Sequence, residues 1–219
     1  SYQGPMMEKR VRPLAEALGV ARLFECDVSS VESMDACFAA LAAEWPTIDF
    51  LVHAIGFSDK NELRGRYVDT SRANFSMTMD ISIYSFTAVC QRAAAMMPEG
   101  GSMLTLTYYG AEKVMPHYNV MGVAKAGLEA SVQYLAEDLG KDGIRVNAIS
   151  AGPIKTLAAS GIGDFRYILK WNEKTLDEEA LVSVSDLGRA GETWSLSGLA
   201  YMEGRIFART MKELICIGK

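Results

Sequence analysis

The chain has 219 residues, 49% of them hydrophobic, and a formal net charge of −5 at pH 7. This length and apolar content suit one domain with a sizeable core. No apolar run reaches the roughly 18 residues that a membrane span requires, and the first residues lack the apolar stretch of a secretory signal. We therefore expect a soluble, cytoplasmic protein without a membrane partner, and the acidic balance argues against a nucleic-acid partner.

Helical and strand-like segments alternate from the first residues onward. Apolar residues recur at helical spacing over 6–18, and 21–28 is predicted to form a short buried strand. A second helix is expected over 30–45, where Ser30 can cap its first turn. The run 48–57 is nearly continuously apolar, which is typical of a strand covered on both faces.

The same alternation continues further along the chain. A long helix is predicted over 70–97, a strand over 102–109, a second long helix over 118–140 and a third covered strand over 144–152. This repetition predicts an α/β fold with a doubly wound parallel sheet between two helical layers, a Rossmann-like three-layer arrangement in one domain over 1–219. Ligands bind beyond the strand C-termini in such sheets.

Residues of the types that bind metals are sparse. His53 and His117 are the only histidines. The four cysteines show no paired spacing of the C-x-x-C kind: Cys26, Cys37, Cys90 and Cys216. We therefore expect no metal site and no disulfide framework, and buried reduced thiols are the simplest interpretation.

Unusual residue clusters follow the predicted strands, at 26–28, 54–57, 107–110 and 151–154, and together they would line one crevice. Glycines at positions 56 and 152 let backbone approach a ligand closely, although an ordinary turn explains either glycine alone. Asp27 could accept a hydrogen bond from an adenine amino group, although such an aspartate is also a common helix cap. Their joint placement favours a dinucleotide.

Tyr108, Tyr118 and Lys125 are separated by ten and then seven positions. Seven residues of an ideal helix turn through roughly 700°, so Tyr118 and Lys125 would project from one face about 10 Å apart. A phenol and an ammonium group at that separation can share one elongated ligand.

The chain resembles the bacterial enoyl-acyl-carrier-protein reductases, NADH-dependent members of the short-chain dehydrogenase/reductase superfamily, in the runs FECDV, LVHAIGFSDK, TYYGAEKVMPHYNVMGVAK, GIRVNAISAGPIKTL and DFRYILKWNE. The likeness extends from Tyr2 to about Glu173. Ordinary members of the superfamily space tyrosine and lysine four apart, whereas this family uses the interval of seven found here.

The resemblance implies hydride transfer from NADH to the β-carbon of a trans-2-enoyl thioester in type II fatty acid synthesis. Tyr118 would hydrogen-bond the developing enolate oxygen. Lys125 would hold the nicotinamide ribose, and Tyr108 would line the acyl pocket and assist positioning. The alternatives are a solvated helix lysine and a tyrosine that only packs in a buried strand.

The resemblance also implies the binding residues. NADH would contact Gln3, Asp27, Val28, Ala54, Ile55, Gly56, Lys125, Pro153, Ile154 and Thr156. The acyl chain would contact Phe57, Tyr108, Met121, Ala158, Ile162 and Phe165, with core packing as the alternative for Met121. Residues 155–175 resemble the substrate-binding lid of the family.

The implied partners are an acyl-carrier protein that brings the substrate and further copies of the chain in a homotetramer. Lys155, Arg166 and Lys170 are available for an acidic carrier, although lysines near a loop are usually only solvated.

Two departures from the family keep alternatives open. The first strand and glycine-rich phosphate turn of the family do not appear in the 219 residues, and 176–219 has an atypical sequence, although 212–218 is predicted as a strand. Two other hypotheses therefore remain open. The chain could be a catalytically silent remnant that forms oligomers, or a carbonyl reductase of the same superfamily.

Overall fold

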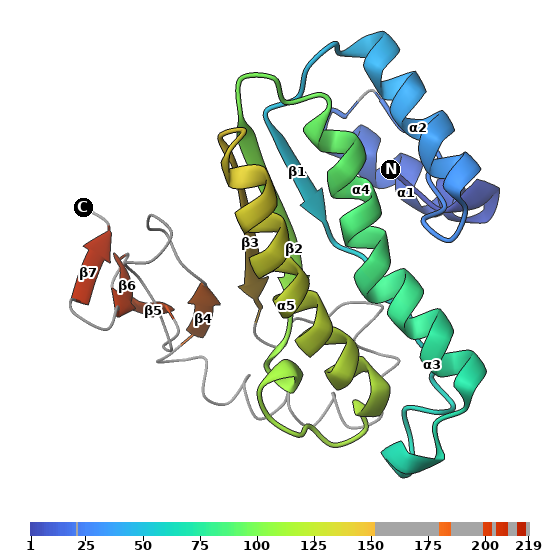
Figure 1. Cartoon of the computed structure of the whole chain (residues 1–219), viewed down its shortest axis with the longest axis vertical. Coiled ribbons are helices and arrows are strands. Elements are labelled where there is room, and N and C mark those ends of the chain that lie inside the picture. Colours follow the sequence, from blue (N-terminus) through green and yellow to red (C-terminus); the bar gives the residue numbers. More distant parts are fainter. Residues whose placement is uncertain (21, 152–179, 185–198, 203–204, 210–213, 218–219) are drawn as a thin grey trace.

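The computed structural model describes residues 1–20, 22–151, 180–184, 199–202, 205–209 and 214–217 (Figure 1). The helical elements are α1 (Gly4–Ala17), α2 (Val31–Glu44), η1 (Tyr67–Asp69), α3 (Arg72–Met79), η2 (Asp80–Tyr84), α4 (Ser85–Ala94), η3 (Tyr109–Ala111) and α5 (Asn119–Gly140). The strands are β1 (Phe50–His53), β2 (Gly101–Thr107), β3 (Ile144–Ser150), β4 (Ala180–Val184), β5 (Leu199–Met202), β6 (Arg205–Arg209) and β7 (Leu214–Ile217). Within this described part of the chain, no helix is long and apolar enough to cross a membrane.

Strands β1, β2 and β3 form the predicted parallel sheet, with β2 in the middle. His53 of β1 lies opposite Thr105 of β2, and Thr107 of β2 lies opposite Ser150 of β3. Parallel neighbours need crossover connections, which the helices between these strands supply. Their C-terminal ends therefore face the same side of the molecule, where the predicted crevice should lie.

The remaining strands continue the sheet in the order β1 to β7, but each of these later pairs is antiparallel. Strand β7 confirms the strand predicted over 212–218 and ends the order beside β6. The antiparallel extension itself was not predicted, because short strands of atypical sequence carry no signal for the direction of pairing.

The main core lies between the parallel strands and the helices α4 and α5, which cross the same face of the sheet (Figure 1). Its fully buried side chains include Phe86 of α4, Met103 of β2, Leu128 of α5 and Ile144 of β3. Each side chain of this kind stabilises the fold by about 1.5–3 kcal/mol when it leaves water. This packing fixes α5, and with it the residues at the start of α5.

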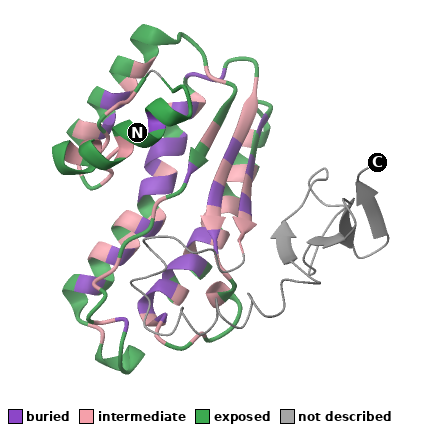
Figure 2. Ribbon diagram, turned by 180° about the vertical axis from the view of Figure 1, so that it is seen from behind, coloured by how far each residue is buried: buried purple, intermediate pink, exposed green. Residues whose placement is uncertain are grey.

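The prediction of a fully covered strand over 48–57 is wrong in its length and on one face. Only four residues pair, and while His53 is 1% exposed, Phe50 and Val52 are 68% and 52% exposed. Burial alternates along β1, whose last residue is buried, and the ribbon of Figure 2 is coloured by this exposure. The ladder stops at His53 because the chain then turns toward η2, where the Phe57 amide donates to Ser82 Oγ at 3.0 Å.

The predicted buried strand over 21–28 is also wrong for its described residues, 22–28. Glu25 forms a single parallel bridge with Tyr2, and the flanking residues are half-buried or exposed. The Tyr2 amide donates to the Phe24 carbonyl at 3.0 Å, and the Cys26 amide donates to the Tyr2 carbonyl at 2.8 Å. Two hydrogen bonds to one residue are too few to extend into a ladder.

The other helices confirm the predictions with adjusted ends. α2 begins after Ser30, whose side chain accepts from the Ser33 amide. The long helix predicted over 70–97 is present as α3, η2 and α4 in succession, and η2 is π-helical. π-Helical turns are rare and often lie at functional sites. Ser82, at the centre of η2, is fully buried.

Candidate active site

Tyr108 and Tyr118 meet beyond the C-terminal end of β2. Tyr108 directly follows the strand, and Tyr118 directly precedes α5. Their rings pack edge to face with centroids 5.1 Å apart, and Tyr118 is only 5% exposed. Burial raises the pKa of both phenols. Both therefore remain protonated at neutral pH and can donate a hydrogen bond.

Two glycines make this ring packing possible. A Cβ atom on Gly110 would lie 2.4 Å from Cδ1 and 2.7 Å from Cε1 of Tyr118. A Cβ atom on Gly122 would lie 2.9 Å from the Gly110 carbonyl oxygen. The Tyr118 ring thus packs against backbone that carries no side chain. Gly110 and Gly122, both between Tyr108 and Lys125, are therefore needed for the position of the ring.

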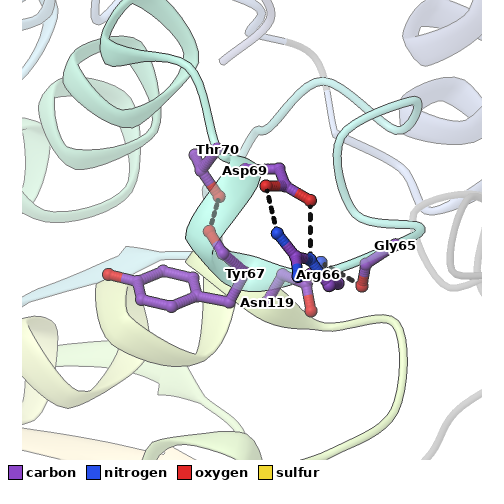
Figure 3. Close-up of polar contacts among 6 residues, drawn as sticks. All are labelled: Gly65, Arg66, Tyr67, Asp69, Thr70 and Asn119. Carbon is purple, nitrogen blue, oxygen red and sulfur yellow. Dashed lines mark hydrogen bonds and ion pairs between the residues drawn. The ribbon is translucent and has the colours of Figure 1, made fainter.

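The backbone on both sides of Tyr118 adopts a left-handed conformation. His117 has φ 57° and Asn119 has φ 36°, a region that costs energy for residues other than glycine. Asn119 Nδ2 offsets this cost by donating to the carbonyls of Glu62 at 3.3 Å and Gly65 at 3.2 Å. Figure 3 shows Asn119 pointing at Gly65 in the loop that leads to α3. The loop therefore fixes the entry into α5.

The same loop is braced internally (Figure 3). Arg66 pairs with Asp69 at 2.9 Å, and Thr70 Oγ1 donates to the Tyr67 carbonyl at 2.7 Å. The ion pair is exposed, so it adds little stability, but it restricts the loop shape. The side chain that orients Tyr118 is thus supported by residues more than fifty positions earlier, which no local sequence pattern indicates.

Lys125 is buried on α5 with 8% of its surface exposed. Its Nζ donates to the Leu106 carbonyl of β2 at 2.8 Å. Burial lowers the pKa of Lys125 to about 8, although the charge of Glu129 acts in the opposite direction. The ammonium group is mostly charged at neutral pH and is held against the end of β2.

Gly56 brings the turn after β1 over this lysine. A Cβ atom on Gly56 would lie 3.5 Å from Met121 Cε, 3.6 Å from Lys125 Nζ and 3.8 Å from Ser82 Oγ. Ser82 also accepts from the Phe57 amide and donates to the Phe57 carbonyl at 3.2 Å. The π-helical turn therefore holds the predicted cofactor-binding turn in place. Ser82 was not predicted, because a single sequence carries no signal for a π-helix.

One further polar side chain near the site, that of Glu129, was not predicted. Thr107 Oγ1, at the end of β2, donates to Glu129 Oε1 at 2.6 Å. Glu129 is half-buried, and burial raises its carboxyl pKa. It lies four residues after Lys125 on α5, a spacing that places two helical side chains side by side. The spacing of four residues from Lys125 could therefore have indicated from the sequence that Glu129 lies near the site.

His53 was not assigned to the site, yet it joins β1 to η2 and β2. Its Nε2 lies 2.9 Å from Ser85 Oγ, and its Nδ1 lies 2.9 Å from Thr105 Oγ1. Each of these hydroxyls also donates to a carbonyl, Ser85 to that of Ile81 and Thr105 to that of His53. Burial, together with the charge of Lys125, lowers the pKa of His53 to about 4. The imidazole is a neutral structural link.

Gln3 and Asp27, both predicted cofactor contacts, also come together. Gln3 Nε2 donates to Asp27 Oδ2 at 3.0 Å, while Asp27 Oδ1 accepts from the Ser29 amide and hydroxyl. These bonds, those from Ser29 first, lower the pKa of Asp27. Val28 packs against the same buried cluster as Leu51 of β1. Asp27 therefore holds the shape of its own loop, whereas the N-cap of α2 is Ser30.

The structure brings several of the predicted residues together. Tyr108, Tyr118 and Met121 share one cluster, and Met121 and Lys125 meet at Gly56. Ala54 and Phe57 are exposed beside them, and Ile55 is half-buried. Several predicted residues lie outside the described ones, namely Pro153, Ile154, Thr156, Ala158, Ile162 and Phe165, together with the lid 155–175 and the basic residues Lys155, Arg166 and Lys170. In the described residues, no three His, Cys, Asp or Glu side chains are grouped to hold a metal ion.

Comparison with known proteins identifies close relatives. A family model described as enoyl-(acyl carrier protein) reductase matches residues 1–206. The chain is 66% identical over 190 residues to the enoyl-(acyl-carrier-protein) reductase (NADH) 1 of Rhizobium meliloti, and 53% identical over 190 residues to the enoyl-(acyl-carrier-protein) reductase (NADH) FabI of Rickettsia felis. The matches cover 87% of this chain in both cases, and 70% and 73% of the relatives.

Comparison with solved structures gives the same family. The enoyl-(acyl-carrier-protein) reductase of Anaplasma phagocytophilum in complex with NAD is 65% identical, with a TM-score of 0.74, and the match covers 78% of this chain and 65% of that one. The Bacillus cereus enzyme with NADP+ and indole naphthyridinone is 50% identical, with a TM-score of 0.74, and the match covers 79% and 68%. The likeness confirms the Rossmann-like α/β fold class. The chain spans 65% to 73% of the length of these relatives.

Proposed function

Because the chain belongs to the enoyl-(acyl-carrier-protein) reductase family, we propose that it reduces the trans-2 double bond of enoyl groups carried by acyl-carrier protein, with NADH as reductant, in type II fatty acid synthesis. The observation that carries this proposal is the burial of the protonated Tyr118 against half-buried Tyr108, together with a buried, charged Lys125 beside the backbone of Gly56. That set can bind a cofactor and stabilise an oxyanion at neighbouring points.

The described residues fit a nicotinamide dinucleotide at two places. Gly56 presents backbone without a side chain directly over Lys125, so a ribose can approach the ammonium group. At the other end, Gln3 and Ser29 hold Asp27 and leave Val28 beside it for an adenine. The residues that would hold the cofactor are Gln3, Asp27, Val28, Ala54, Ile55, Gly56 and Lys125. When bound, NADH supplies the hydride.

Tyr118 is the hydrogen-bond donor to the substrate. Its hydroxyl is neutral because burial raises the pKa of the phenol, so its proton is available to the thioester oxygen as negative charge develops there. The ring cannot swing away, because Tyr108 packs on one side and Gly110 on another. A fixed donor of this kind stabilises the transition state more than the ground state.

Lys125 binds the nicotinamide ribose and keeps the local potential positive. Its position is set by the hydrogen bond to the Leu106 carbonyl and by the neighbouring carboxylate of Glu129. A positive charge in a buried site also favours a developing oxyanion. Tyr108, Met121 and Phe57 provide the apolar wall for the acyl chain, and Met121 reaches that wall from α5.

We further propose that the enzyme is a cytoplasmic homotetramer. Val123 and Tyr134 lie on one face of α5 and are 40% and 76% exposed, and Tyr84 of η2 is 56% exposed. Apolar side chains of this size on neighbouring helices suit an interface between subunits. Light scattering would show four times the 23.9 kDa mass of one chain, and a monomeric mass would contradict the tetramer.

The activity is tested by NADH oxidation with a crotonyl thioester. Tyr118→Phe should lower kcat by about 10²–10³-fold, the usual loss when one oxyanion donor is removed, while NADH affinity stays nearly unchanged. Lys125→Ala should lower both kcat and NADH affinity. Tyr109→Phe and Lys113→Ala, both at exposed neighbouring positions, are the matched controls. A folded chain that binds NADH but gives no turnover would contradict the proposed activity, as would equal loss of NADH binding in the two variants.

A further inference from the structure

Two cysteines that are eleven positions apart in the sequence lie together beside the adenine side of the proposed cofactor site. Ser33 Oγ of α2 accepts from the Asp27 amide at 2.9 Å, which brings the first turn of α2 against 26–28. Cys37 lies four residues after Ser33, and therefore on the same face of α2. Its thiol lies close enough to that of Cys26 for each to alter the pKa of the other. The spacing in the sequence gives no sign of this pair.

Their surroundings differ from those of an ordinary core thiol. Cys26 is half-buried against the cluster that contains Met34. Cys37 is buried but borders a cavity of about 300 Å³ lined by Phe24, Glu25, Ser33, Ala36, Cys37 and Ala40. By contrast, Cys90 is 0% exposed inside the main core. A small reagent can therefore reach Cys37 through the cavity but has no comparable route to Cys90.

The two thiols differ in acidity. The interaction with Cys26 lowers the pKa of the Cys37 thiol, and the same interaction, with burial, raises the pKa of Cys26. A lower pKa increases the fraction of thiolate, which is the form that attacks a disulfide. The neighbouring carboxylate of Asp27 acts on Cys26 in the same direction as burial. Because Cys37 is the thiol that borders the cavity, it is the nucleophile of the pair, and Cys26 is the resolving thiol.

We propose that Cys26 and Cys37 form a reversible dithiol–disulfide site that reacts with low-molecular-weight disulfides, and that its oxidation weakens dinucleotide binding. The Cys37 thiolate attacks one sulfur of the reagent, RSSR, and expels RS⁻. Cys26 then loses its proton to water and attacks the Cys37 sulfur of the mixed disulfide, which expels the second RS⁻. Two protein thiols become one disulfide, and one RSSR becomes two RSH.

Oxidation should affect NADH binding because the proposed adenine contacts lie between the two cysteines in the sequence. A disulfide brings the two Cβ atoms to about 3.8 Å, so it ties Cys26 to α2. Asp27 and Val28 directly follow Cys26. The segment is also held by the bridge to Tyr2, by the hydrogen bonds of Asp27 and by the packing of Cys26 and Val28 against the cluster of Met34. Movement of Cys26 therefore moves the adenine contacts. This second half of the proposal rests on the proposed function, whereas disulfide formation does not.

The test uses the full chain in buffers with increasing ratios of oxidised to reduced glutathione. After denaturation and alkylation, intact mass should change from four labels to two, because the chain has four cysteines, and peptide mapping should give the 26–37 link. Cys90→Ala should still lose two labels, whereas Cys37→Ser and Cys26→Ser should not. Four labels at every ratio, a link to another cysteine, or glutathione held on Cys37 without resolution would overturn the site.

NADH titration of the oxidised and reduced chain tests the coupling. Oxidation should weaken binding by about tenfold or more, corresponding to 1.4 kcal/mol, and reduction should restore it. Equal affinity in the two states would overturn the coupling. A chain that binds no NADH in either state would contradict the proposed function instead, while the count of alkylated thiols would still decide whether the disulfide forms.

Discussion

The two ends of the proposed cofactor site are built differently. At one end, Tyr118 and Lys125 are buried, and backbone atoms lie so close that an added methyl group has no room. At the other end, 22–30 is held by one bridge and by hydrogen bonds among exposed or half-buried side chains. The first end is rigid because packing leaves no alternative, whereas the second is adjustable. Chemistry needs fixed donors, while adenine binding tolerates small displacement.

The sharpest test of the rigid end is Gly110→Ala. The new Cβ must displace the Tyr118 ring, which would lie 2.4 Å away. Overpacking of this kind costs about 1–3 kcal/mol of stability, and displacement of a catalytic group by about 1 Å costs about 10²-fold in rate. Steady-state kinetics and urea unfolding measure both effects. Gly140→Ala, where nothing lies within 4 Å, is the control and should retain full activity. Full activity of Gly110→Ala would show that the ring has room to move.

Acid should lower the stability of the fold through His53, which lies at the rigid end. Its pKa is lowered from 6.5 in the unfolded chain to about 4 in the fold. The unfolded state therefore binds the proton first as pH falls, and stability is lost progressively from pH 6.5 down through about pH 4. At 1.36 kcal/mol per unit, the loss is roughly 3 kcal/mol. Urea unfolding across this range measures it, and His53→Gln should remove this part of the slope. An unchanged slope in the variant would assign the acid sensitivity to other groups.

Glu129→Gln should have a moderate effect on the same end. Glutamine can still accept from Thr107, but it no longer favours the charged form of Lys125, so the pKa of Lys125 falls below about 8. NADH binding that depends on this charge is lost as pH rises through that pKa. At pH 8 the affinity should fall by roughly two- to five-fold, corresponding to about 0.5–1 kcal/mol for a partly exposed pair. Binding curves at several pH values measure the midpoint, and an unshifted midpoint would contradict the link.

The adjustable end should respond in affinity alone. Gln3→Ala removes one exposed hydrogen bond to Asp27, which still accepts from Ser29. One such bond is worth about 0.5–1.5 kcal/mol, so NADH affinity should fall by no more than about tenfold and kcat should not change. Gln133→Ala, an exposed glutamine on α5, is the control. A large loss of kcat in Gln3→Ala would show that the two ends are mechanically coupled.

Much of the rigid end could be predicted from the sequence. The interval from Tyr108 to Lys125 spans one strand end and one helix, so its geometry is set largely by local structure. The parallel strands were visible for the same reason, because apolar runs alternate with helical periods. The prediction of helix 118–140 was accurate to one residue at its start.

The errors arose where distant residues decide the local structure. Residues 22–28 have a strand-like composition, but pairing depends on a neighbouring strand, and among the described residues Tyr2 alone forms a bridge with them. The apolar run 48–57 does not reveal that the chain leaves the sheet after His53 to reach Ser82. The pairing of Cys26 with Cys37 likewise depends on how α2 docks on 26–28.

The π-helical turn η2 implies a strict limit on chain length in this region. Each residue of a regular helix advances the side-chain direction by about 100°, and η2 takes up the difference between the faces of α3 and α4. Removal of one residue from Asp80–Tyr84 would restore regular helix and turn Ser82 away from Phe57, or else turn all of α4 away from the sheet. Insertions and deletions should therefore be tolerated far less here than substitutions, although the surface of η2 includes exposed positions.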